Sequence, residues 1–145
     1  MMEKLDVKDK YYTPSIEEFH VGFEYEDYNK YRKEWIKSIW TREDFENDSH
    51  VYYLFELFYG KQLRVKYLDK EDIESLGFEY YKTHPGMNQM EFEGGKYLLT
   101  YDPDFAGRGW LRIAMEGEGD VTLFTGTIKN KSELKKILEM INVKK

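Results

Sequence analysis

The sequence predicts an α+β fold in which an antiparallel sheet is packed by a C-terminal amphipathic helix. Aromatic residues make up 17% of the 145 residues, and aromatic rings pack well on the pleated surface of a sheet. Segments in which apolar and polar residues alternate follow one another through short turns, which join antiparallel strands and are too short for parallel ones. The last segment has an apolar stripe with helical spacing. We expect about five or six strands and one or two further short helices.

The N-terminal residues carry weak structural signals. Residues 1–15 are expected to form a flexible arm that includes Thr13-Pro14, since proline and the residue before it favour an extended turn. Residues 16–145 contain no repeat, low-complexity tract or linker and are interpreted as a single domain. The first strand is expected from Phe19, where apolar and polar residues begin to alternate.

The next two segments are interpreted as helices. Asp27 is placed to cap a helix through about Trp40, in which aromatic and apolar residues recur at spacings of three and four. Residues 51–59 are almost continuously apolar, so periodicity does not separate a buried strand from a short helix. We favour the helix, because several of these apolar residues share one helical face. The stripe of the first helix comprises Tyr28, Tyr31, Trp35 and Ile39.

The next predicted strand covers residues 61–68, and a local signal for a capped helix follows it. Asp69 is placed to cap a helical turn through Ser75, with Asp72 as the reciprocal cap three residues later. Gly77 follows, and glycine at such a position adopts the left-handed conformation that ends a helix.

The remaining chain is expected to form strands and then a helix. Turns are predicted at Gly94-Gly95 and at residues 117–120, both of which contain two glycines. Asn130 is placed to cap the C-terminal helix, whose apolar stripe opens at Leu134. One helix cannot bury such a stripe alone, so we expect it to pack on the sheet. The predicted strands are 78–82, 89–93, 96–102, 109–116 and 121–128.

Charge and composition disfavour several classes of function. The net charge of −6 makes nucleic acid an unfavourable partner. The absence of Cys excludes a disulfide, a thiolate zinc site and a cysteine nucleophile. The sequence contains no apolar run of about 18 residues, the length that would predict a membrane-spanning helix. The polar N-terminus has no secretory signal. We therefore expect a cytoplasmic protein, in the cell that produces it or in an infected host cell.

No residue pattern predicts a catalytic residue, a cofactor or a metal site. His20 and Glu24 lie on one side of the predicted first strand, but at about 13 Å apart they cannot share an ion. Gly107-Arg108-Gly109 precedes a strand instead of opening a helix, unlike a phosphate-binding loop. No serine lies in a Gly-x-Ser-x-Gly elbow. An enzyme is therefore not favoured.

Three stretches are distinctive as strings: YTPSIEEFHVGFEYE at residues 12–26, RVKYLDKEDIESLG at 64–77 and FTGTIKNKSEL at 124–134. They resemble a group of small, functionally uncharacterised proteins of Bacteroidetes bacteria and their phages. The resemblance implies a phage or mobile-element accessory protein. It implies no activity and no site residue, and it does not extend to residues 28–59.

The aromatic residues suggest the leading hypothesis, a non-enzymatic protein that binds a host or phage protein. Tyr and Trp are enriched at interfaces because they bury area at small entropic cost. A phage accessory protein of this kind would plausibly inhibit a host defence component. The expected partner-binding residues are Tyr28, Tyr31, Trp35, Trp40, Tyr52 and Tyr53.

Two alternatives remain open. The first is a protein that binds a small ligand or nucleotide, or an enzyme acting on one, in which cationic side chains hold an anion. The second is an acidic mimic of DNA, although interleaved Lys and Arg residues weaken that idea. The oligomeric state is not predicted. The expected anion-binding residues of the first alternative are Arg64, Lys66, Arg108 and Arg112.

Overall fold

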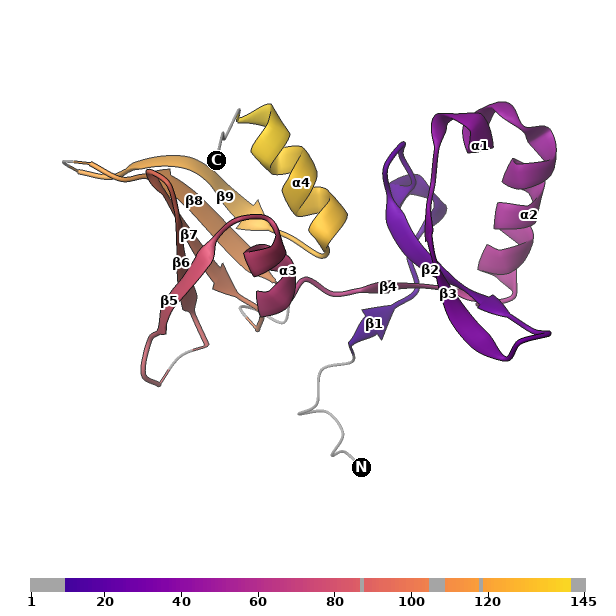
Figure 1. The fold of residues 1–145 in the computed structure, drawn as a ribbon, viewed down its shortest axis with the longest axis horizontal. Coiled ribbons are helices and arrows are strands. Elements are labelled where there is room, and N and C mark those ends of the chain that lie inside the picture. The colour runs from indigo at the N-terminus through magenta and orange to yellow at the C-terminus, as the bar shows by residue number, and fades with distance from the viewer. Residues whose placement is uncertain (1–9, 87, 105–108, 118, 142–145) are drawn as a thin grey trace. The chain divides into compact units, whose positions relative to one another are not determined.

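The computed structural model describes residues 10–86, 88–104, 109–117 and 119–141, and confirms the α+β class. The chain divides into two compact units, residues 1–67 and 68–145. Each unit has its own antiparallel sheet (Figure 1). Each unit also has its own hydrophobic core. The predicted single domain over residues 16–145 therefore contains two such units. Whether they unfold together stays a prediction.

The first unit consists of a four-stranded sheet with the order β1-β4-β2-β3 and two helices. Helix α2 packs on one face of this sheet, because Leu54 and Leu57 share a buried cluster with Leu63 and Val65. Other buried members of that cluster are Phe19, Phe23 and Trp40. The elements are β1 (Tyr11–Tyr12), a 3-10 turn (Ile16–Glu18), β2 (Glu24–Asn29), β3 (Glu34–Ile39), α1 (Arg42–Glu46), α2 (Asp48–Tyr59) and β4 (Leu63–Lys66).

The predicted helix from Asp27 to Trp40 is wrong, since these residues form most of the β2–β3 hairpin. Tyr28 and Trp35 do not lie along one helical stripe. They pair across the two antiparallel strands, with ring centroids 5.4 Å apart. The turn between them is stabilised by Asn29, whose side-chain oxygen accepts from the backbone amides of Tyr31 and Arg32 at 3.0 and 2.9 Å.

The start of the first unit also differs from the prediction. Tyr11 and Tyr12 pair with Lys66 and Val65 of β4, so residues 10–15 belong to the folded unit and not to a flexible arm. Residues 1–9 lie outside the described residues. The alternating segment from Phe19 enters a strand only at Glu24, because a turn precedes it, in which the Phe23 amide donates to the His20 carbonyl oxygen at 2.9 Å and Gly22 has a φ of 96°.

The preference for a helix at residues 51–59 is confirmed by α2. This helix begins one residue after Asn47, whose side-chain oxygen accepts from the backbone amides of Ser49 and His50. Such a cap supplies partners to two of the amides that a helix start leaves unpaired. Helix α2 is therefore held at its start by local bonds and along its length by core packing.

The second unit consists of a five-stranded meander, β5-β6-β7-β8-β9, and two helices. Asp69 and Asp72 form the predicted capping box of α3, and Gly77 has the left-handed φ of 99°. The turn between β6 and β7 is Gly95-Lys96, one residue later than predicted. The elements are α3 (Lys70–Ser75), β5 (Glu79–Thr83), β6 (Met90–Gly94), β7 (Tyr97–Asp102), β8 (Trp110–Met115), β9 (Val121–Thr127) and α4 (Lys131–Met140).

The C-terminal helix α4 begins after Asn130, as predicted, and the Asn130 side chain accepts from the amide of Glu133 at 2.8 Å. Leu134 of α4 is fully buried in the cluster that includes Leu99 and Ile113 of the sheet. The helix therefore packs on the sheet of its own unit. None of the helices in the described parts of the chain is both long and apolar enough to cross a membrane.

Candidate partner-binding surface

Helix α2 presents aromatic residues to solvent as well as to the core. Tyr52, Phe55 and Tyr59 are spaced i, i+3 and i+7, so they share one stripe of the helix. Their exposed fractions are 67%, 38% and 76%. The rings of Phe55 and Tyr59 are stacked, with centroids 6.4 Å apart. We call these three residues the α2 aromatic face.

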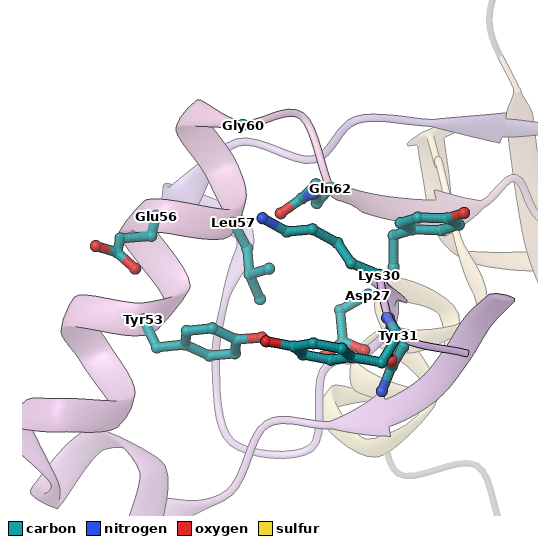
Figure 2. A pocket seen from close by; sticks show the side chains of 10 residues that line it. Asp27, Lys30, Tyr31, Tyr53, Glu56, Leu57, Gly60 and Gln62 are labelled. Carbon is teal, nitrogen blue, oxygen red and sulfur yellow. Dashed lines mark hydrogen bonds between the residues drawn. The ribbon is translucent and has the colours of Figure 1, made fainter. Parts of the chain in front are cut away.

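A pocket of about 490 Å³ lies beside this face, between α2 and the β2–β3 turn. Tyr53, Glu56, Leu57 and Gly60 line it from the helix side. Figure 2 shows the rings of Tyr53 and Tyr31 extending toward one another from the two sides. Asp27, Tyr28, Asn29, Lys30, Tyr31 and Gln62 complete the lining.

Asp27 is the half-buried carboxylate of this pocket. It is paired in register with Ile36 and Leu63, which places it on the sheet face that α2 covers. Burial raises the pKa of Asp27 above its ordinary value. Within the described residues no ion pair involves Asp27, Lys30 or Glu56. The pocket therefore contains a partly desolvated negative charge that the protein itself leaves unneutralised.

Tyr25 lies on the same face, close to Asp27. Burial first, and then the nearby charges of Asp27 and Asp44, raise the pKa of Tyr25 to about 12. The phenol of Tyr25 therefore stays neutral at physiological pH. It can donate a hydrogen bond but supplies no charge to the pocket.

The opposite face of the four-stranded sheet holds Arg64 between two aromatic rings. The guanidinium carbon lies 3.7 Å from the ring centroid of Tyr11 and 4.3 Å from that of Trp35. Arg64 also donates from Nε to Glu26 Oε1 at 2.8 Å. Such stacking and pairing are favourable for a guanidinium. The charge of Arg64 is thus already engaged within the unit.

The six predicted partner-binding residues do not form one surface. Tyr28, Tyr31 and Tyr53 line the pocket, and Tyr52 belongs to the α2 aromatic face. The Tyr28 and Trp35 side chains pair with each other, on the sheet face that carries Arg64. Trp40 is only 3% exposed and packs against Phe19 and Phe45, so the prediction that it binds a partner is wrong.

The structure describes three of the four predicted anion-binding residues. Arg64 and Lys66 belong to the first unit, and Arg112 of the second unit donates to the Thr122 hydroxyl at 3.0 Å. Arg108 lies outside the described residues. None of the three described residues lines the pocket of the first unit.

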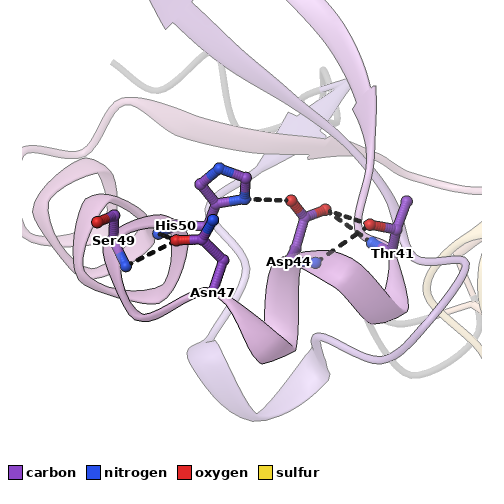
Figure 3. A network of polar contacts seen from close by, with 5 residues as sticks. All are labelled: Thr41, Asp44, Asn47, Ser49 and His50. Carbon is purple, nitrogen blue, oxygen red and sulfur yellow. Dashed lines mark hydrogen bonds and ion pairs between the residues drawn. The ribbon is translucent and has the colours of Figure 1, made fainter.

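A histidine–carboxylate pair joins α1 to α2. His50 Nδ1 lies 2.9 Å from Asp44 Oδ1, while Asp44 Oδ2 accepts from the amide and the hydroxyl of Thr41 at 2.8 and 2.9 Å (Figure 3). Burial alone would raise the pKa of Asp44, but the bonds from Thr41 and His50 lower it. The arrangement is a helix cap with a cross-link, since no described serine or threonine hydroxyl contacts His50 as a nucleophile would.

The other two histidines each lie beside an oxygen atom of a glutamate. His84 Nε2 bonds the carboxylate of Glu91, and His20 Nδ1 lies 3.0 Å from the carbonyl oxygen of Glu18. Among the described ranges, no group of three or more His, Asp or Glu side chains is placed to hold a metal ion.

Sequence reasoning missed several residues of the aromatic face and of the pocket. Phe55 and Tyr59 could have been found, because they follow Tyr52 at helical spacing on a segment that was expected to be a helix. Asp27 and Lys30 could not have been found in this way, because they meet α2 only through the β2–β3 hairpin, which was interpreted as a helix.

Comparison of the chain with protein-family models, with curated proteins and with solved structures finds no match.

Proposed function

We propose that this chain is a non-enzymatic binding protein whose first unit holds a protein partner on the α2 aromatic face. The observation that carries the proposal is the exposure of Tyr52, Phe55 and Tyr59 on one stripe of a helix. Scattered exposed apolar residues need no explanation, whereas neighbouring exposed rings are typical of interaction sites.

The support beneath these rings favours binding without rearrangement. Leu54 and Leu57 fix the helix on the sheet, and Asn47 caps its start. A tyrosine ring buries a large area while losing few rotatable bonds. A capped and packed helix with exposed rings therefore offers a preorganised surface, which lowers the entropic cost of association.

The wider setting rests on the resemblance to proteins of Bacteroidetes bacteria and their phages. On that basis we propose that the partner is a host or phage protein in the bacterial cytoplasm, plausibly a component of host defence that this chain inhibits. The many aromatic residues of the chain fit such a role.

A second candidate function is binding of a small molecule in the pocket of the first unit, whose volume of about 490 Å³ suits such a ligand. A nucleotide or another anion is disfavoured, because Asp27 and Glu56 line the pocket with one cation, Lys30. The predicted cations Arg64, Lys66 and Arg112 do not line it. The α2 aromatic face therefore remains the better-supported site.

The test is affinity capture with matched tyrosine variants. The purified chain, with Tyr52→Ser and Tyr59→Ser combined, is compared with the wild type in lysate of cells that express it. Tyr81→Ser is the control, because Tyr81 is 59% exposed but belongs to β5 of the second unit. We expect the double variant to lose a partner that the wild type and the control both capture. Equal capture by all three would contradict the proposal.

A further inference from the structure

The surface around α2 is acidic as well as aromatic. Residues 43–60 contain five Asp or Glu side chains and no Lys or Arg. One of the five, Glu56, lies on α2 and lines the pocket beside the aromatic face. An acidic surface of this kind attracts a positively charged partner and repels a negatively charged one.

The pocket beside the face has a matching chemistry. Asp27 is half buried on the sheet side and has no ion-pair partner among the described residues. Tyr31 and Tyr53, which line the same pocket, extend toward one another, as Figure 2 shows. A partly desolvated carboxylate gains from a nearby cation, and the face of a tyrosine ring attracts a cation as well.

The first unit already holds one arginine with this combination of groups. Arg64 lies between the rings of Tyr11 and Trp35 and bonds the carboxylate of Glu26. Two aromatic rings and one acidic side chain thus satisfy a guanidinium on one face of the sheet. Tyr31, Tyr53 and Asp27 supply the same set of groups on the other face, with no guanidinium between them.

Building on the proposed function, we propose that this pocket receives an arginine or lysine side chain of the protein partner. The cationic group meets the Asp27 carboxylate, and its stem or planar face lies against Tyr31 and Tyr53. The rest of the partner covers the α2 aromatic face. Arginine fits better than lysine, because its planar guanidinium stacks on rings and can donate two parallel bonds to a carboxylate.

Lys30 is the one cation of the pocket lining, and it bears on the choice of ligand. An anionic ligand would meet Lys30, but it would also face the carboxylates of Asp27 and Glu56. A cationic ligand faces two opposite charges and one like charge. The exposed Lys30 side chain is long and flexible, so it can turn toward solvent when another cation enters.

The first test uses peptides as probes. An acetylated and amidated tetra-arginine peptide is titrated into the full chain and followed by calorimetry and by backbone amide shifts, with a tetraglutamate peptide of the same length for comparison. We expect the arginine peptide to bind and to shift amides of residues 27–31 and 53–62, and we expect binding to weaken as salt rises. Shifts confined to other parts of the chain would overturn the proposal.

Matched variants locate the binding charge. Asp27→Asn keeps the shape of the side chain but removes its charge. We expect it to weaken binding of the arginine peptide about tenfold, because a charge-assisted bond is lost. Tyr53→Leu is a second variant, and we expect it to weaken binding of the arginine peptide severalfold. Glu79→Gln, on β5 of the second unit, removes one exposed negative charge elsewhere and is the control. Equal weakening by Asp27→Asn and Glu79→Gln would reduce the effect to net charge and overturn the proposal.

Two further outcomes separate this inference from the proposed function. If a captured partner is lost with Tyr52→Ser and Tyr59→Ser but retained with Asp27→Asn at unchanged affinity, the binding face stands and the arginine pocket is wrong. If methylguanidinium alone binds as tightly as the tetra-arginine peptide, the pocket is a site for a small cation, and the proposal of a partner side chain is overturned.

Discussion

Arg64 donates from Nε to Glu26 Oε1 at 2.8 Å, and its Nη2 lies 2.7 Å from the same oxygen. The bond joins β4 to β2, two strands that are adjacent in the sheet although the residues are 38 apart in sequence. Tyr11 and Trp35 cover the guanidinium on its two sides. The pair therefore stabilises the first unit, and this use of Arg64 argues against its predicted role in binding an anion.

The first prediction concerns this pair. Arg64→Met is expected to lower the free energy of unfolding by about 1–3 kcal/mol, because it removes a charge-assisted bond and leaves Glu26 partly buried without its partner. Urea unfolding of both proteins measures the difference. The control is Arg32→Met, since the Arg32–Glu34 pair is well exposed and such pairs contribute about 0–1 kcal/mol. Equal losses in the two variants would contradict the assignment.

The second prediction concerns Asp44, whose pKa in the folded protein lies below its ordinary value. A depressed carboxyl pKa contributes stability above the unfolded pKa, and this contribution is lost as the pH falls through the folded pKa. Asp44→Asn should therefore lower the stability of the folded protein at about pH 7 and change it little at about pH 2. Thermal unfolding at the two pH values tests this, and a cost that is independent of pH would exclude the charge as its source.

The third prediction concerns Asp27, whose pKa is shifted in the opposite direction to that of Asp44. Burial raises its pKa, so the folded state binds the proton more tightly than the unfolded state, and stability falls as the pH rises through the folded pKa. Asp27→Asn removes this loss. We expect a higher melting temperature than the wild type at about pH 7 and no difference at about pH 3. A lower melting temperature at neutral pH would show that Asp27 makes a favourable contact in the free protein.

Stability gained by removing Asp27 would have a functional meaning. A residue that costs stability in the free protein is typical of a binding site, where a ligand supplies the missing partner. The third prediction and the weaker peptide binding of the same variant therefore belong together.

The fourth prediction concerns the two cores, which have no residue in common. Leu134→Ala in α4 is expected to cost about 2–5 kcal/mol, since Leu134 is fully buried. Hydrogen exchange should show faster exchange in β7 and β8 and unchanged exchange in β4 and α2. Faster exchange in both units by the same factor would instead support the single cooperative domain expected from the sequence.

Local signals predicted the second unit well. The capping residues Asp69 and Asn130 mark the starts of two helices, and Gly77 marks the end of one. These signals work because the cap bonds join residues two to four positions apart, so the surrounding tertiary structure changes them little. Short Gly-containing turns between alternating segments predicted the antiparallel order of the strands in the meander, because such turns are local as well.

The first unit was harder, because its signals are ambiguous. Tyr28 and Trp35 are seven residues apart, a spacing that suits both a helical stripe and a hairpin pair. Only the bonds that Asn29 makes within the turn, and the pairing of β2 with β4, favour the hairpin. The location of Asp27 opposite α2 depends on that hairpin. The pocket therefore could not be predicted from the sequence, whereas the aromatic character of the surface could.

The most direct test of the central claim, that a partner lies on the α2 aromatic face, is site-specific photo-crosslinking in living cells. The photoreactive residue p-benzoylphenylalanine replaces Tyr59 in one strain and Tyr81 in another, because both tyrosines are well exposed. We predict a cross-linked adduct of defined mass from position 59 and none from position 81. The adduct should disappear when Tyr52→Ser is added. An adduct from position 81 alone, or the same adducts from both positions, would contradict the account.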